Sequence, residues 1–174
     1  MASIVAASRL MREAYAGILL LDPDGPHPLP GLPGDPLLVR GSPLLSMIGS
    51  LLEMVEPHTA FLWPRPDEPS RDEHVRVTHL ALAGPVGGLS GLVLLSPAGH
   101  HHGLTARELE VLGAIIDGCT NAQIADRLTV ASRTVATHIE HILAKLGSPS
   151  RTHAAVLAQR EGLYVPPLPA PSLR

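Results

Sequence analysis

The fold is decided by residues 104–166, which read LTARELEVLGAIIDGCTNAQIADRLTVASRTVATHIEHILAKLGSPSRTHAAVLAQREGLYVP. This stretch holds four successive segments with apolar residues at helical spacing, and each is preceded by a helix-start signal. The spacing between the second and third segments leaves room only for a tight turn. Two short helices joined in this way have the geometry that places a helix in the major groove of DNA.

The first two helices each begin with a capping box, in which a side chain and a backbone N–H satisfy one another. Thr105 with Glu108 forms the first box, and Thr120 with Gln123 forms the second. Gly118 follows the first helix and is predicted to end it in the left-handed conformation that glycine adopts without strain. These signals predict two short helices in succession.

The third helix is predicted to begin at Ser132 as its N-cap and to end at Gly147 and Pro149. The apolar stripe that forms its buried face consists of Val135, Ile139, Ile142 and Leu146. A fourth helix is predicted from Ser150 to Gly162. Its small alanines suit close packing of helices, within the domain or across a dimer.

The ordered motifs of this segment resemble the LuxR-type helix-turn-helix domain, also called the NarL type. Leu-Thr-x-Arg-Glu-x-Glu-Val-Leu occupies 104–112, Gly-x-Thr-Asn-x-x-Ile-Ala occupies 118–125, and Ser-x-x-Arg-x-x-Ala occupies 148–154. The matching residues of the third helix are Ser132, Thr134, Val135, His138, Ile142, Lys145 and Leu146. The resemblance covers roughly a third of the chain, and it implies a four-helix domain whose third helix reads DNA and whose fourth helix often dimerises.

The third helix and the starts of two helices supply the candidate DNA-binding residues. The candidates for base contact, which lie opposite the apolar stripe, are Arg133, Thr134, Thr137, Glu140 and His141. The candidates for phosphate contact, two of them through helix N-termini, are Thr120, Asn121, Ser132 and Lys145. The Glu140 carboxylate is suited to accept a hydrogen bond from a cytosine amino group.

The charge of this segment is low for a DNA-binding domain. Residues 103–174 carry seven Lys and Arg against six Asp and Glu, a net charge of +1. Affinity for DNA comes largely from neutralised phosphates, so this balance predicts modest affinity, a need for a dimer, or a partner that adds contacts. Many LuxR-type domains carry Lys directly after Thr-Val and a basic or amide residue four positions on, where this chain has Ala136 and Glu140.

The preceding half of the chain is acidic and is interpreted as the part that controls the DNA-reading segment. Residues 1–102 carry six basic and ten acidic side chains, a net charge of −4, which disfavours contact with DNA. The single cysteine, Cys119, excludes an intramolecular disulfide and indicates a cytoplasmic protein. No apolar run approaches the ~18 residues of a membrane span. The start of the chain, with Arg9 and Arg12, is predicted to be an amphipathic helix and not a signal peptide.

The N-terminal half is predicted to mix strands with a helix. The apolar or alternating segments that predict strands are 17–22, 75–82 and 89–95. An amphipathic helix is predicted over 43–56 with Ser42 as its cap, and irregular loops over 23–43 and 64–70. This order resembles a PAS- or GAF-type sensor module. Such domains usually have five strands, and about three are visible here, so the module is interpreted as truncated or as completed by a second subunit.

The predicted fold class is therefore α+β, with a small mixed sensor-like module followed by an all-α four-helix helix-turn-helix domain. The predicted boundaries are 1–98 for the sensor or dimerisation module, 99–103 for a linker, 104–166 for the DNA-binding domain and 167–174 for a Pro-rich tail.

Other chemistry-bearing residues have simpler interpretations. The histidines at 100–102 could ligate a metal, but adjacent side chains do not point at one centre, which favours a linker. Cys119 beside a helix start could sense oxidants, although a small residue filling a variable position is the favoured interpretation. The sequence has no nucleophile motif, no phosphate-binding glycine loop and no acidic pocket of a phosphoryl-accepting receiver domain. It therefore predicts no enzyme, no cofactor and no metal site.

These observations predict a bacterial transcription regulator of the LuxR type that binds operator DNA as a homodimer through about 132–146. Double-stranded DNA is the expected partner, RNA polymerase a further one, and a small-molecule ligand of the N-terminal module stays unidentified. The alternative is a protein-interaction module that keeps the helix-turn-helix fold but has lost specific DNA reading.

Overall fold

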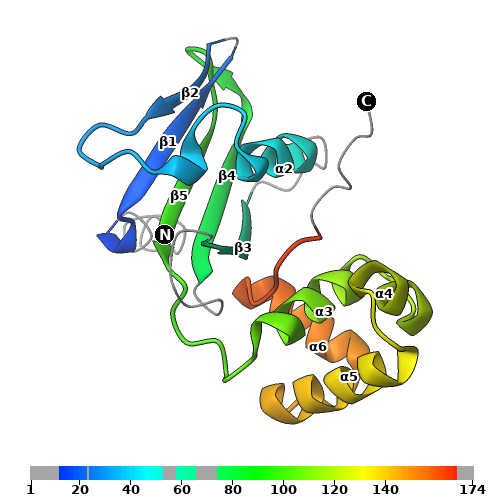
Figure 1. Cartoon of the computed structure of the whole chain (residues 1–174). Coiled ribbons are helices and arrows are strands. Elements are labelled where there is room, and N and C mark those ends of the chain that lie inside the picture. Colours follow the sequence, from blue (N-terminus) through cyan, green and yellow to red (C-terminus); the bar gives the residue numbers. More distant parts are fainter. Residues whose placement is uncertain (1–11, 23, 53–57, 66–73, 168–174) are drawn as a thin grey trace. The chain divides into compact units, whose positions relative to one another are not determined.

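The computed structural model describes residues 12–22, 24–52, 58–65 and 74–167 (Figure 1). Its contacts divide the chain into two compact units. Within the described residues, the first unit comprises 12–60 and 75–97, and the second comprises 61–65, His74 and 98–167. The predicted N-terminal amphipathic helix falls mostly outside the described residues.

The N-terminal half forms a five-stranded sheet with the order β2-β1-β5-β4-β3. The strands are β1 (Ala16–Leu21), β2 (Gly25–Pro28), β3 (His58–Pro64), β4 (His74–Val86) and β5 (Leu89–Pro97). Strand β1 pairs antiparallel with both β2 and β5, and β5 pairs antiparallel with β4. The three predicted strands are confirmed as β1, β4 and β5, and the five strands equal the number expected of the sensor type. The resemblance to a PAS- or GAF-type module stays a prediction.

Two strands were missing from the sequence prediction for identifiable reasons. β2 lies inside the segment predicted as an irregular loop, and its four residues, GPHP, include two prolines. Proline cannot donate to the ladder and is tolerated on an edge strand, which is where β2 lies. β3 reads HTAFLWP, and its consecutive Phe61, Leu62 and Trp63 are all buried, so the alternation that marks a half-exposed strand is absent.

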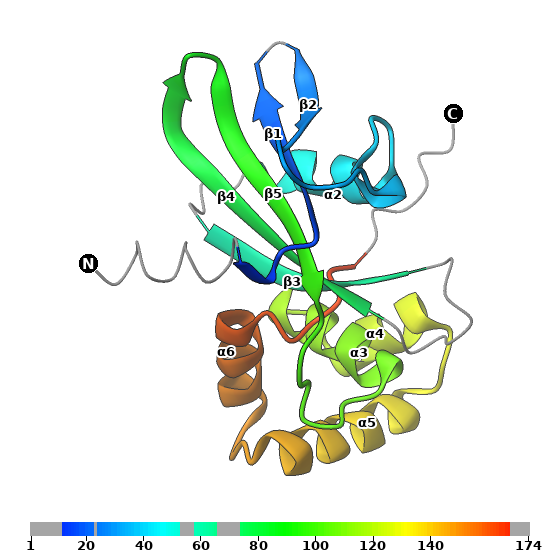
Figure 2. The same ribbon diagram turned by 90° about the vertical axis from the view of Figure 1, so that its left-hand side faces the viewer.

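One face of the central sheet is covered by α2 (Pro43–Leu52), as Figures 1 and 2 show. Ile18, Val93 and His79 are cross-strand neighbours on β1, β5 and β4, and each is at most 4% exposed. Ser42 caps α2 by accepting a hydrogen bond from the Leu45 N–H at 3.2 Å, as predicted. The predicted continuation to residue 56 lies outside the described residues. The 3-10 helix η1 (Pro36–Leu38) precedes α2.

His79 is a buried polar residue in this core. Its side chain is almost fully buried, and its Nε2 has no hydrogen-bond partner within the part of the chain that the structure describes. Burial lowers the pKa of the imidazole, and neighbouring His58 lowers it further. The side chain is therefore neutral at pH 7.

The second unit contains four helices: α3 (Ala106–Ile116), α4 (Asn121–Leu128), α5 (Ser132–Leu146) and α6 (Arg151–Glu161). Both predicted capping boxes are present. The Thr105 N–H donates to Glu108 Oε2 at 2.7 Å, and the Thr120 N–H donates to Gln123 Oε1 at 2.7 Å. Gly118 has a φ of +78°, as the predicted end of the first helix requires.

One predicted cap is wrong. The N-cap of α5 is Ala131 and not Ser132, which lies one residue inside the helix. The Val135 N–H donates to the Ala131 carbonyl at 3.2 Å, so the helical ladder begins one residue earlier than the sequence prediction placed it. α6 begins and ends as predicted, because Ser150 accepts from the His153 N–H and Gly162 has a φ of +61°.

The core of the second unit is built from the predicted apolar faces. Leu109, Leu112, Ile124, Val135 and Ile142 are at most 1% exposed. Of the predicted stripe on α5, Leu146 is also buried and Ile139 is half-buried.

The segment that follows α6 crosses α3. The Val165 N–H donates to the Leu109 carbonyl at 3.2 Å. A Cβ at Gly113 would lie 2.0 Å from the Val165 carbonyl oxygen, so only glycine fits at this crossing. The chain beyond α6 is thereby part of the domain.

Candidate nucleic-acid interface

A three-residue turn joins α4 to α5. Thr129, at the end of α4, has φ +55° and ψ +48°, a left-handed conformation that residues other than glycine rarely adopt. Its N–H bonds to carbonyls of the last turn of α4, and the Val130 N–H donates to the Ala125 carbonyl at 3.0 Å. These hydrogen bonds satisfy carbonyl groups in the last turn of α4, and α5 begins directly after the turn. The predicted tight turn between these helices is confirmed.

The face of α5 opposite the core is exposed to solvent along its length. The predicted base-contacting residues are all on it and all exposed: Arg133, Thr134, Thr137, Glu140 and His141. Thr137 Oγ1 donates to the Arg133 carbonyl at 3.2 Å, which fixes its hydroxyl against the helix. The Arg133 guanidinium makes no ion pair with any described residue. This face therefore presents one free cation and several short polar side chains.

The starts of α4 and α5 differ in a way that bears on phosphate contact. At α4 the Gln123 N–H is capped by Thr120 Oγ1 at 3.3 Å. At α5 the cap residue is Ala131, which offers no side-chain acceptor, so the first N–H groups of α5 are not capped by a side chain. Ser132 is exposed beside them. Free N–H groups at a helix start, together with the helix dipole, attract an anion such as phosphate.

Lys145 and Glu108 form an ion pair that sequence reasoning missed. Lys145 Nζ donates to Glu108 Oε2 at 2.7 Å, and His141 Nδ1 lies 4.0 Å from Glu108 Oε1. Burial by itself would raise the pKa of Glu108. Hydrogen bonds from Lys145 and from the Thr105 N–H and hydroxyl outweigh burial, and with the charge of Lys145 they hold the pKa below its usual value. Glu108 is thus a buried carboxylate, and Lys145, predicted to contact phosphate, supplies its counter-charge.

Arg151 of α6 forms two hydrogen bonds with residues at the start of α4. Its Nη1 donates to Asn121 Oδ1 at 2.7 Å, and its Nη2 donates to the Cys119 carbonyl. The sequence placed Asn121 among the phosphate candidates; its amide oxygen accepts from Arg151, and its amide N–H groups are the donors that a phosphate would need. Arg151 appeared in the sequence only as a motif residue, because no local pattern indicates a partner 30 positions away.

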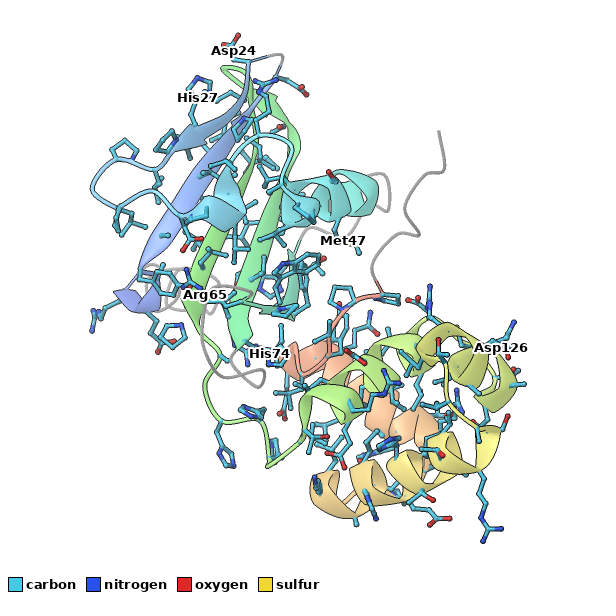
Figure 3. All side chains as sticks on the ribbon, in the orientation of Figure 1. Asp24, His27, Met47, Arg65, His74 and Asp126 are labelled. Atoms are coloured by element: carbon cyan, nitrogen blue, oxygen red, sulfur yellow. The ribbon has the colours of Figure 1, made fainter. Side chains whose placement is uncertain are left out.

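The electrostatic environment of the exposed surface is mixed. Glu140 is exposed among the candidates on α5, and Asp126 projects from α4 into solvent (Figure 3). Among the other cations of the domain, Arg107 pairs with Glu110 and Arg127 with Asp117. Together with the Lys145–Glu108 pair, these ion pairs engage three of the seven Lys and Arg residues of 103–174.

Two further findings concern sites that the sequence raised. Among the described residues, no group of three His, Cys, Asp or Glu side chains is arranged to hold a metal ion. None of the helices in the described ranges is both long and apolar enough to cross a membrane.

The arrangement of α4, the Thr129 turn and exposed α5 defines the class of the domain as a helix-turn-helix, a DNA-reading fold. Residues 102–158 match the family model for bacterial regulatory proteins of the luxR family. The C-terminal helix-turn-helix domain of this chain therefore belongs to the luxR family, as its motifs predicted.

The relatives matched through this domain are transcriptional regulators and not enzymes, in agreement with the sequence prediction. The chain is 49% identical over 63 residues to the transcriptional regulatory protein LiaR of Bacillus subtilis (strain 168), covering 36% of this chain and 30% of LiaR. It is 50% identical over 56 residues to the DNA-binding transcriptional activator DevR/DosR of Mycobacterium tuberculosis, covering 32% of this chain and 26% of DevR/DosR. The matched region thus spans less than a third of the length of either relative.

Two solved structures align with most of the chain at low identity. The VqmA dimer of Vibrio cholerae, a LuxR-type receptor solved without target DNA, aligns with 93% of this chain and 90% of its own at 17% identity and a TM-score of 0.38. SdiA of Escherichia coli aligns with 94% of this chain and 90% of its own at 15% identity and a TM-score of 0.36.

Proposed function

We propose that this chain is a cytoplasmic transcription regulator that binds operator DNA as a homodimer, with α5 in the major groove. The observation that carries the proposal is the exposed face of α5, on which the five base-contact candidates lie opposite a buried stripe. Arg133 suits a guanine and Glu140 a cytosine amino group. RNA polymerase is the expected further partner of a regulator of this class.

The start of α5 supports the same placement. The first N–H groups of α5 have no side-chain acceptor, and Ser132 is exposed beside them. A phosphate docked there would position the helix, while the side chains along its face would read bases. Thr120 is exposed at the start of α4 and is a second candidate for phosphate contact.

The net charge and the surface of α6 support dimerisation. A net charge of +1 over 103–174 gives one copy few phosphate contacts, and two copies on adjacent half-sites double them. α6 buries Ala154 and Ala158 in the domain but leaves Val156 45% exposed. An exposed valine on the helix that often dimerises in this family is a suitable contact for a second copy.

A specific observation favours the alternative function. Glu140 lies in the middle of the exposed α5 face, and the charge of Lys145 is partly compensated by Glu108. An α5 face with so little free positive charge would also suit a protein partner. We therefore keep the interaction module as the second candidate.

Binding to genomic DNA fragments at several salt concentrations separates the two candidates. We expect Arg133→Ala to weaken binding to the preferred site by about 1–3 kcal/mol and to relax preference at one base pair, and Thr137→Ala to do so with the salt slope unchanged. The matched control is Arg160→Ala, which removes one exposed cation from α6. Equal affinity of the wild type for specific and random DNA, with no effect of either α5 variant, would favour the interaction module.

A further inference from the structure

The N-terminal unit carries a solvent-open groove between the β1–β2 hairpin and α2. The groove has a volume of about 220 Å³, and its apolar walls are Leu20 of β1, Pro26 of β2, and Leu45 and Ile48 of α2. Typical sites for drug-sized ligands start at about 300 Å³, so this groove has the size for a small metabolite.

An exposed arginine lies at one edge of the groove. The Arg40 guanidinium donates to the Asp24 carbonyl at the tip of the hairpin, where Figure 3 labels Asp24. Gly25 suits this turn because its φ is +87°, and the Arg40 guanidinium occupies the space where a Cβ would lie. This hydrogen bond favours one position of the exposed side chain before a ligand arrives, which reduces the entropy lost on binding.

The charge of Arg40 has no counter-ion in the described part of the chain. Its only bond there is to the neutral Asp24 carbonyl, which leaves further N–H donors unused. A guanidinium presents paired donors with the geometry of a carboxylate, and such pairs are among the strongest hydrogen bonds in proteins. The groove thus combines an anion-binding edge with an apolar wall.

We propose that this groove binds a small amphipathic carboxylate, with the carboxylate on Arg40 and the apolar chain against Leu20, Leu45 and Ile48. A neutral molecule of the same shape would leave the guanidinium without a charge partner, and an anion without an apolar part would leave the groove walls exposed. The site therefore distinguishes this ligand class from both. The proposal concerns the N-terminal unit alone and stands apart from DNA binding.

Gly49 allows the groove to be filled without touching Arg40. Gly49 lines the groove on α2, its φ is not positive, and a Cβ placed there meets nothing within 4 Å. A leucine at this position would fit the helix and occupy the space of the ligand. Because glycine inside a helix is unfavourable by roughly 0.5–1 kcal/mol relative to alanine, the variant is expected to fold.

The test is a titration of the full chain with sodium hexanoate, followed by isothermal calorimetry and by changes in NMR amide shifts. We expect hexanoate to bind at least about tenfold more tightly than hexanamide or sodium acetate, since a tenfold change corresponds to about 1.4 kcal/mol. Arg40→Gln should weaken hexanoate binding about tenfold or more, and Gly49→Leu should abolish it. Arg12→Gln, which removes an exposed cation near the opposite end of β1, is the control and should leave it unchanged.

The proposal is overturned by any of three results. These are no detectable binding of hexanoate to the wild type, equal binding of hexanoate and hexanamide, and undiminished hexanoate binding by a folded Gly49→Leu variant. Shifted amides confined to the groove residues in the wild type would support it. Because Gly49→Leu leaves Arg40 intact, its result stands even where Arg40→Gln disturbs the hairpin.

Discussion

Removing the cation from the Lys145–Glu108 pair is expected to destabilise the helix-turn-helix domain. In Lys145→Met the Glu108 carboxylate, 3% exposed, loses a 2.7 Å hydrogen bond from a charged donor but keeps those from Thr105. Hydrogen bonds to charged groups contribute about 1.5–3 kcal/mol. Because the Lys145 side chain is 33% exposed, water screens part of that, and about 1–2 kcal/mol is the expected loss. For a domain of this size that corresponds to a fall in Tm of roughly 4–16 °C.

The loss should also depend on pH. In the wild type the pKa of Glu108 is lowered, so its contribution to stability is present above the usual pKa of 4.5 and is lost as pH falls through the lower folded value. Lys145→Met removes the hydrogen bond and the charge of Lys145, which both lower the pKa of Glu108, so the carboxyl protonates more readily than in the wild type. The difference between the two proteins is therefore expected to be large at pH 7 and to shrink toward pH 4.

Thermal melting followed by circular dichroism of the full chain measures both effects. Arg160→Met is the control, since it removes an exposed cation for which no ion pair is found in the described residues, and it should change stability by less than about 0.5 kcal/mol. Two results would contradict a stabilising ion pair. One is an equal Tm of Lys145→Met and Arg160→Met at pH 7, and the other is a loss of Tm in Lys145→Met that is the same at pH 4 and pH 7.

Three further perturbations have distinct expected outcomes. Val135→Asp places a carboxylate at a fully buried position and should unfold the domain at a cost of several kcal/mol, seen as loss of its helical melting transition, whereas Arg133→Asp at an exposed position should not. Gly113→Ala brings a Cβ to 2.0 Å from a backbone carbonyl and should cost about 1–3 kcal/mol in the same assay, and a variant as stable as wild type would contradict that close approach. The pKa of His79 is lowered in the folded protein, so as pH falls the unfolded chain binds a proton at this residue before the folded chain does. The free energy of unfolding of the N-terminal unit should therefore fall by up to about 1.4 kcal/mol per pH unit as pH drops from 6.5 to the folded pKa. Denaturant midpoints measured for His79→Gln should lack that pH dependence.

The parts of the fold that sequence predicts well are those specified locally. Thr105 with Glu108 and Thr120 with Gln123 form their boxes across three residues, so the pattern contains all the information that the geometry needs. The cap of α5 was misplaced to Ser132 because serine is a strong cap residue, and the helix instead begins after an alanine with no side-chain acceptor.

The candidate site was predictable in outline and not in its contacts. The exposed face of α5 follows from helical periodicity, since a residue such as Arg133 must lie opposite the buried Val135. The bonds of Lys145 to Glu108 and of Arg151 to Asn121 join residues 37 and 30 positions apart. Such pairings depend on how helices pack, and no local spacing of residue types indicates them.

The crossing of α3 by the segment after α6 has a consequence for how the domain is made. The Val165 N–H reaches back 56 positions to the Leu109 carbonyl, and Gly113 leaves room for the adjoining carbonyl. During synthesis α3, α4 and α5 emerge first and can pack through contacts between near neighbours in the sequence. The part of α3 around Leu109 and Gly113 stays uncovered by this segment until residue 165 has left the ribosome. We therefore expect nascent chains that end before that point to expose apolar surface of α3 and to need protection from aggregation.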